Sequence, residues 1–209
     1  LFRTKIFTYL AAATPGLREL VTIGKIWELA LDERKVKSGR PYDLVIVDAP
    51  ATGHGIGFLE TPRTFAKIAK VGPMHAQANA LDSFICNHRR TGVVLVAAPE
   101  EMPVNESAQL EERLVEEVGV SVDRAYMNGL YPERFSEGEA EQLEAVTANG
   151  DGGAAVAVKA ALGQHRRAVS QRRQLARLRE LLTTDVSTLP FVFRPELGMD
   201  EISELAELI

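Results

Sequence analysis

Short apolar runs and stretches of helical periodicity alternate along this chain. The apolar runs cover residues 42–47, 91–99, 123–128 and 185–190. The first two show no alternation with polar residues, which is typical of strands buried on both faces of a parallel sheet. Helices are predicted over residues 62–86, 103–118 and 154–183. The alternation of strand and helix predicts an α/β fold with a mostly parallel sheet covered by helices on both faces.

The first strand is preceded by a mostly helical stretch, residues 2–36, which Thr14-Pro15-Gly16 divides into two helical segments. A length of 209 residues suits one sizeable domain. We therefore expect residues 1–209 to form a single domain. Residues 133–155 are acidic and then glycine-rich, and we expect them to form a flexible insertion within it.

Composition and charge exclude several classes of function. The chain is 45% hydrophobic and 25% charged, as in ordinary globular proteins. Its net charge of -5 gives no general attraction for nucleic acid, so no nucleic-acid partner is expected. The single cysteine, Cys86, excludes an intrachain disulfide framework and a cysteine-based zinc site. A lone thiol and the lack of a signal peptide or an eighteen-residue apolar run favour a cytoplasmic location.

The densest group of chemically useful residues follows the first apolar run. Asp48 ends that run, and Thr52 and three glycines follow it closely. A carboxylate at the end of a buried strand is suited to hold Mg²⁺ beside phosphates, directly or through a water. Glycines let the backbone approach a terminal phosphate and move when it leaves. The alternative is a solvated loop in which Asp48 only forms a turn, and the buried strand before it favours a site.

Residues 46–54 resemble the switch II motif of the ArsA family of anion-transporting ATPases, which includes the ATPases that target tail-anchored proteins. The usual motif reads Asp-Thr-Ala-Pro-Thr-Gly-His. Asp48, Thr52, Gly53 and His54 match it position for position, whereas the Ala-Pro pair is shifted by one residue. The resemblance implies that Asp48 holds Mg²⁺ through a water and that Thr52 and Gly53 face the γ-phosphate. These three are the predicted catalytic residues.

Three further segments resemble the same family, in the family's order. Residues 97–102 resemble its strand ending in Pro-Glu, and residues 127–132 resemble its strand ending in Val-Asn. The resemblance implies that the Asn128 amide reads the adenine edge by donating and accepting hydrogen bonds. The third segment is residues 189–191, which resemble the family's loop that packs on adenine. The resemblance implies that Pro190 and Phe191 cover the adenine ring. The implied protein has a P-loop NTPase-like fold, uses ATP and Mg²⁺, forms a homodimer, and acts with a client protein or a membrane transport subunit.

The P-loop of that family is not found in this sequence. Gly24-Lys25 is not a P-loop, because Ile26 follows it and Glu19 stands where the first glycine should be. We expect the P-loop and the switch I aspartate to lie upstream, which would make this domain incomplete at its N-terminus. The chain alone is then expected to be inactive, although the complete protein would be an ATPase.

Two other functions stay open beside a switch ATPase that couples ATP hydrolysis to transport or targeting. One is a non-catalytic interaction module derived from the fold. The other is a partitioning or placement ATPase of the ParA/MinD kind, against which the acidic tail 201–209 argues. An arsenite response is not expected, because clustered thiolates are the suitable ligands and Cys86 is alone.

Two surface features have competing interpretations. Apolar residues at helical spacing within residues 65–85 indicate core packing, or alternatively a surface for a client helix. An arginine cluster within residues 166–179 indicates a solvated helix face, or alternatively a site for an acidic partner or a lipid surface. The four histidines have no metal-ligand spacing, and only His54 is a candidate sensor of the switch.

Overall fold

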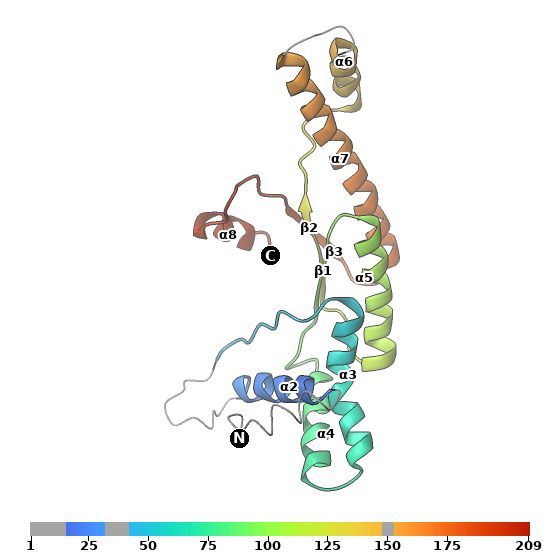
Figure 1. Ribbon diagram of the computed structural model, residues 1–209, viewed down its shortest axis with the longest axis vertical. Coiled ribbons are helices and arrows are strands. Elements are labelled where there is room, and N and C mark those ends of the chain that lie inside the picture. Colours follow the sequence, from blue (N-terminus) through green and yellow to red (C-terminus); the bar gives the residue numbers. More distant parts are fainter. Residues whose placement is uncertain (1–15, 32–41, 148–152) are drawn as a thin grey trace. The chain divides into compact units, whose positions relative to one another are not determined.

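The computed structural model describes residues 16–31, 42–147 and 153–209, and its helices and strands are labelled in Figure 1. The described residues form two compact units. One comprises residues up to Gly92 together with Glu112–Ser121, and the other comprises Val93–Glu111 together with Val122–Ile209. The second unit is called the sheet unit below and the first the helical unit.

Three parallel strands form the centre of the sheet unit. Strands β1 (Val94–Ala97), β2 (Arg124–Leu130) and β3 (Val186–Pro190) pair in the order β1-β2-β3. Between β1 and β2 the chain passes through α5 (Glu101–Arg113) and the π-helix η1 (Leu114–Val118). Between β2 and β3 it passes through α6 (Glu137–Thr147) and the long α7 (Gly153–Leu181). The parallel α/β fold expected from the alternating pattern is confirmed.

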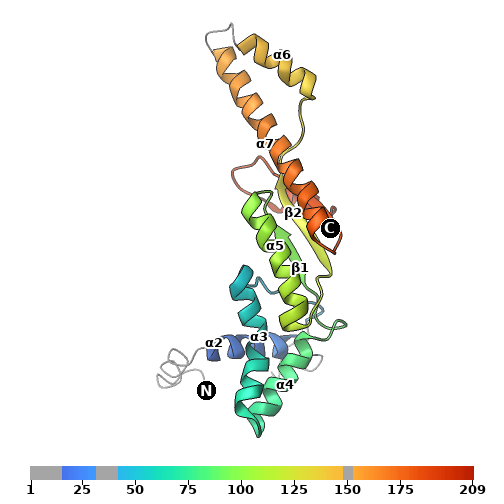
Figure 2. The ribbon, with the colours of Figure 1, turned by 90° about the vertical axis from the view of Figure 1, so that its right-hand side faces the viewer.

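The side chains of β1 alternate between a buried and an exposed face. Leu95 and Ala97 of β1 are 4% and 2% exposed, and their neighbours across the ladder, Ala125 and Met127, are also buried. Figure 2 shows α5 and α7 lying along the sheet, and both helices contribute fully buried side chains such as Val104 and Leu178. The opposite face of β1 carries Val94 and Val96, which remain 56% and 59% exposed.

The helical unit consists of α2 (Leu17–Leu29), α3 (Thr52–Ala69), α4 (Pro73–Ile85) and η1. The single helix expected over residues 62–86 is in fact two helices joined by a short turn. Lys70 and Gly72 in that turn have φ angles of +51° and +96°, which a continuous helix does not allow. Gly72 makes the turn at little cost because it has no Cβ.

Arg63 joins three elements of the helical unit. From α3 it donates hydrogen bonds of 2.7 Å to the carbonyl oxygens of both Glu117 and Val118, at the end of η1. Its Nε lies 3.2 Å from a carboxylate oxygen of Asp82 on α4. A guanidinium here satisfies carbonyls that have no partner within their own helix and complements the negative end of the helix dipole.

Cys86 lies beside Arg63, with its Sγ 3.4 Å from Arg63 Nη2. Burial raises the pKa of the Cys86 thiol, and the Asp82 carboxylate raises it further, while Arg63 opposes both without reversing them. A thiol with a raised pKa is a weak nucleophile at neutral pH. The surroundings of Cys86 are therefore those of a packed structural cysteine.

The strand expected at residues 42–47 is not formed. This segment pairs with none of β1, β2 and β3, and the side chains of Leu44 and Ile46 are 74% and 85% exposed. An apolar run becomes a buried strand only where neighbours accept and donate its backbone hydrogen bonds. The described strands pair only among themselves, so this run has the composition of an inner strand without the neighbours of one.

The expected insertion at residues 133–155 contains α6 and the first residues of α7, and residues 148–152 lie outside the described part. That residues 1–209 form one domain stays a prediction. None of the helices in the described residues is both long and apolar enough to cross a bilayer.

Candidate functional site

An irregularity in the β2–β3 ladder brings three predicted site residues together. Asn128 pairs with Leu189 and Leu130 pairs with Pro190, so Gly129 is an extra residue that forms a bulge. Gly129 has a φ of +82°, a conformation that residues with a Cβ rarely adopt. The Phe191 amide then donates a 2.8 Å hydrogen bond to the Leu130 carbonyl. Asn128 is exposed, and its backbone pairs with Leu189, the residue before Pro190 and Phe191, where the parallel strands end.

Three aromatic rings form a cluster at the same edge. The ring centroids of Tyr131, Phe191 and Phe193 lie 4.8–5.1 Å apart in all three pairings, with tilted or edge-on geometry. Phe191 and Phe193 are nevertheless 41% and 48% exposed. Packed but solvent-facing aromatic rings offer a ready surface for another planar ring. These three residues are called the aromatic cluster below.

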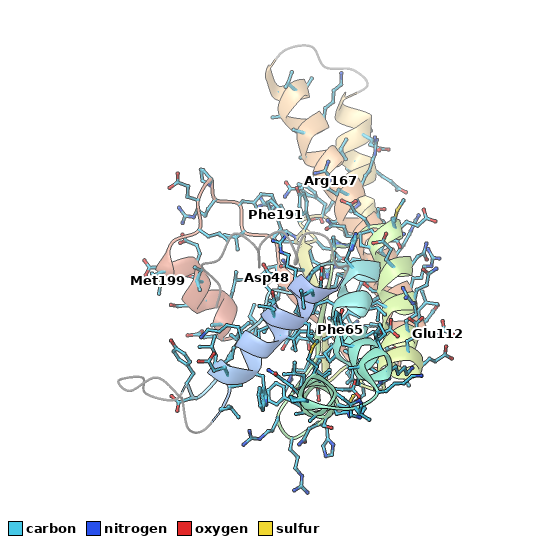
Figure 3. The ribbon with its side chains drawn as sticks, turned by 60° about the horizontal axis from the view of Figure 1, so that its bottom comes forward. Asp48, Phe65, Glu112, Arg167, Phe191 and Met199 are labelled. Atoms are coloured by element: carbon cyan, nitrogen blue, oxygen red, sulfur yellow. The ribbon has the colours of Figure 1, made fainter. Side chains whose placement is uncertain are left out.

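Two arginines flank the aromatic cluster. The guanidinium of Arg134 lies 5.5 Å from the ring centroid of Phe193, and that of Arg167 lies 5.4 Å from that of Tyr131. Arg167 also donates a 3.1 Å hydrogen bond to the Tyr131 hydroxyl. Figure 3 shows Arg167 on α7 and Phe191 on the segment that follows β3. Cation–π contacts of this kind stabilise the ring positions and place positive charge beside them.

Helix α7 also holds the backbone of Tyr131. The Tyr131 amide donates a 2.8 Å hydrogen bond to Oε1 of the buried Gln171, and Arg172 donates to the Tyr131 carbonyl at 3.4 Å. Because buried amide groups are costly to leave without a partner, Gln171 fixes the course of the chain directly after β2. The position of the aromatic cluster thus depends on a helix forty residues further along the chain.

The arginine cluster of α7, predicted as a solvated face, is engaged in contacts within the protein. Besides Arg167 and Arg172, the contacts are Arg166 with Glu144 at 2.7 Å, Arg177 with Asn105 at 2.6 Å and Arg179 with the Val186 carbonyl at 3.2 Å. Arg166, Arg167 and Arg179 are exposed, whereas Arg172 and Arg177 are half-buried. The charged ends of these side chains contact the neighbours of α7. The exposure agrees with the expected solvated face, and the contacts show that the same arginines also bind neighbouring elements of the fold.

The site residues predicted from the sequence did not include Tyr131, Phe193, Arg134 and Arg167. One signal for Phe193 was present, because residues two apart in an extended segment share a side and Phe191 was already a candidate. Arg167 belongs to the arginine cluster visible in the sequence, but its position over Tyr131, like that of Arg134 over Phe193, depends on contacts across the fold.

The predicted phosphate-binding residues lie at the start of α3, in the helical unit. Asp48 is exposed in the irregular segment before the helix, Thr52 is the first residue of α3, and Gly53 follows it. The N-cap residue Ala51 provides no side-chain hydrogen bond, so the first N–H groups of an eighteen-residue helix have no capping partner from it. Such N–H groups favour an anion.

Two close approaches shape this segment. A Cβ on Gly55 would lie 2.7 Å from the Pro50 carbonyl oxygen, so the chain before α3 folds tightly against the first helical turn. A Cβ on Gly53 would lie 3.8 Å from Nη1 of Arg113, which is held by a bidentate ion pair with Glu117. His54 is exposed within the same turn.

The six predicted site residues therefore fall into two groups. Asn128, Pro190 and Phe191 are brought together in the sheet unit, and Asp48, Thr52 and Gly53 are consecutive or nearly so in the helical unit. That all six line one site stays a prediction. Within residues 16–31, 42–147 and 153–209, no three His, Cys, Asp or Glu side chains cluster closely enough to hold a metal ion by themselves.

The middle of the chain matches a known protein family. Residues 66–150 match the family described as anion-transporting ATPase. This segment runs from the end of α3 to α6 and the residues after it, so it includes Asn128 and excludes both Asp48 and Phe191.

Three similar proteins are also named as ATPases. The protein named ATPase BagA of Mycobacterium tuberculosis is 36% identical over 104 residues. Proteins that are also named as ATPases, from Mycobacterium bovis and from a second strain of Mycobacterium tuberculosis, match to the same extent. The matched stretch is 49% of this chain and 29% of each relative, so the match spans under a third of the relatives' length.

Proposed function

We propose, from the premise that residues 66–150 place this chain in the ArsA family of anion-transporting ATPases, that the protein binds ATP and hydrolyses it as a molecular switch. The reaction is phosphoryl transfer to water. In such a reaction the protein contributes positioning and neutralisation of charge.

The observation that carries the proposal is the pairing of Asn128 with Leu189, directly before Pro190 and Phe191, at the carboxyl end of parallel strands. This edge is where open α/β sheets bind their ligands. An Asn amide has both a donor and an acceptor, and adenine presents both on its edge. In this proposal Pro190 and Phe191 cover the adenine ring, while Tyr131 and Phe193 support Phe191 from within the aromatic cluster.

A separate part of the proposal concerns the phosphates, which the segment from Asp48 to Gly55 in the helical unit would bind. Here Asp48 would hold Mg²⁺ through a water, and Thr52 and Gly53 would face the γ-phosphate at the start of α3, whose N-cap residue provides no side-chain hydrogen bond. The donor chemistry fits, since Mg²⁺ prefers oxygen ligands and usually keeps several waters, so it does not need a cluster of protein ligands. The ion supplies neutralisation of the charge on the phosphates. Movement of the tightly folded Asp48–Gly55 segment would report the γ-phosphate to α3.

Several finer features belong to the same proposal. The complete protein acts as a homodimer in the cytoplasm and couples ATP hydrolysis to transport or to the targeting of a client protein. An interaction module without catalysis and a partitioning ATPase of the ParA/MinD kind are the competing proposals. Turnover of ATP by the complete gene product excludes the first, and binding to a client in place of DNA argues against the second.

Adenine recognition is tested by displacing a fluorescent ADP analogue with ADP and with GDP. We expect Asn128→Ala to weaken ADP binding about tenfold and to remove most of the preference for ADP over GDP. The matched control is Asn79→Ala, which removes an exposed amide of α4 in the helical unit and should leave both affinities unchanged. An Asn128→Ala protein that binds and discriminates like the wild type would contradict the proposed adenine site.

The role of Asp48 is tested separately, by ATP turnover of the complete gene product. Asp48→Asn should lower kcat by on the order of 100-fold, because it removes the carboxylate that would position Mg²⁺ beside the phosphates, while ADP affinity should change little. Unchanged turnover would contradict the role of Asp48 and leave the adenine site untouched.

A further inference from the structure

The apolar residues of α3 and α4 divide into a buried set and an exposed set. Ala78, Leu81 and Ile85 are at most 5% exposed and form the core of the helical unit. Further along the same two helices, Ile68, Val71 and Met74 are 70%, 81% and 56% exposed. Core packing thus explains only the part of the apolar pattern that lies away from the turn.

The exposed residues gather at the turn between the two helices. Residues 67–74, which comprise this turn and the adjoining ends of α3 and α4, are called the hairpin tip below. Figure 1 shows the hairpin tip at the free end of the α3–α4 hairpin, away from α2. Exposed apolar side chains that lie this close together often mark an interaction site.

The hairpin tip is also positively charged in a chain whose net charge is -5. Lys67 and Lys70 are both exposed, and no acidic residue occurs between Glu60 and Asp82. The other basic residues between Glu60 and Asp82 are Arg63 and His75, and both face inward. Arg63 is held by η1 and Asp82, and Nδ1 of His75 lies 2.8 Å from the Ala66 carbonyl oxygen.

The shape of the hairpin tip favours a flat partner over a helical one. An amphipathic client helix lays its apolar face into a groove. The tip is instead a turn at the end of two helices, and its apolar side chains project from it. Apolar side chains between lysines suit the boundary between lipid headgroups and acyl chains, where anionic lipids attract the lysines.

We propose that the hairpin tip binds the surface of membranes that contain anionic lipids, with Ile68, Val71 and Met74 entering the interface and Lys67 and Lys70 contacting the headgroups. The attachment is peripheral, in agreement with the lack of a helix able to span a bilayer among the described residues. It is independent of the nucleotide site and does not require the proposed ATPase activity.

The test is co-sedimentation with vesicles of phosphatidylglycerol and phosphatidylcholine, and with vesicles of phosphatidylcholine alone. The wild-type protein should sediment with the anionic vesicles, and binding should weaken as NaCl is raised from about 0.1 M to 0.5 M. Lys70→Glu should reduce the partition coefficient about tenfold, because it removes one attraction and adds a repulsion. Ile68→Ser should reduce it by a similar factor.

Helix α7 provides matched controls. Lys159 is exposed as Lys70 is, and Val156 is 69% exposed, close to the value for Ile68. Lys159→Glu and Val156→Ser therefore make the same changes of charge and polarity at another exposed place, and both should bind vesicles like the wild type. Circular dichroism checks that all four variants are folded.

Any one of three results would overturn the proposal. The first is a wild-type protein that stays in the supernatant with anionic vesicles at low salt. The second is tip variants that sediment like their controls. The third is binding of the tip, without any binding to vesicles, to a peptide of the acidic C-terminal residues 196–209, which include helix α8 (Met199–Ala206). That result would assign the hairpin tip to a protein partner.

Discussion

Glu111, near the end of α5, is a carboxylate with an unusual number of partners. It is 6% exposed and accepts hydrogen bonds of 2.7–3.1 Å from the backbone amides and hydroxyls of Thr183 and Thr184. Burial by itself raises the pKa of Glu111, but these hydrogen bonds outweigh it, and the net pKa is below the ordinary value. The ionised form is therefore favoured by folding and ties α5 to the loop between α7 and β3.

The lowered pKa predicts how stability depends on pH. Stabilisation by Glu111 is fully present above its unfolded pKa of about 4.3, and it is lost as the pH falls through the folded pKa. Glu111→Gln should lower the free energy of unfolding at pH 7 by about 1–3 kcal/mol. The free energy of unfolding of the Glu111→Gln protein should also fall less steeply than that of the wild type between pH 7 and pH 3, as measured by urea unfolding.

The neighbouring Glu112 provides the control. It is exposed, and Glu112→Gln should change the free energy of unfolding by less than about 0.5 kcal/mol at either pH. A Glu111→Gln protein with the same acid dependence as the wild type would show that this carboxylate does not contribute to the acid transition.

At the scale of elements, the start of α3 is shaped by the Asp48–Ala51 segment that precedes it. Gly55→Ala places a methyl group 2.7 Å from the Pro50 carbonyl oxygen, so either the segment or the helix must shift. We expect a loss of about 1–3 kcal/mol in the free energy of unfolding. Faster amide hydrogen exchange at residues 48–55 should accompany it.

Gly57→Ala is the control for that prediction. It lies in the same helix, two residues further on, and a Cβ there meets nothing within 4 Å. The substitution should raise stability by up to about 1 kcal/mol, since alanine favours the helix more than glycine does. Equal behaviour of the two variants would mean that the approach of Pro50 to α3 does not constrain the segment.

At the scale of the whole molecule, ligand binding should be visible as stabilisation. A ligand that binds only the folded state at 100 times its Kd adds about 2.7 kcal/mol. For a chain of this size that corresponds to a rise in Tm of roughly 5–10 °C. We expect this rise with Mg-ADP, a smaller rise with Mg-GDP at the same concentration, and a smaller response to ADP in Asn128→Ala. Equal shifts with the two nucleotides would argue against selection for adenine.

The sequence by itself determined the features that depend on local pattern. The runs at 91–99, 123–128 and 185–190 became β1, β2 and β3, and helical spacing located α5 and α7. Asn128, Pro190 and Phe191 could be proposed because they follow strand ends, and parallel strands bring their carboxyl ends to one edge. Periodicity and strand ends are properties of neighbouring residues, so one sequence is enough to detect them.

Only the tertiary structure decided the features that depend on residues far apart. The apolar run at 42–47 has a strand's composition but remains exposed, because pairing is provided by neighbouring strands and cannot be read from the run. The aromatic cluster depends on Gln171 and Arg167 of α7, and the bulge at Gly129 depends on the register of β3. Likewise, the pattern along α3 and α4 could not show which apolar residues enter the core, since the turn at Lys70–Gly72 directs the rest to the surface.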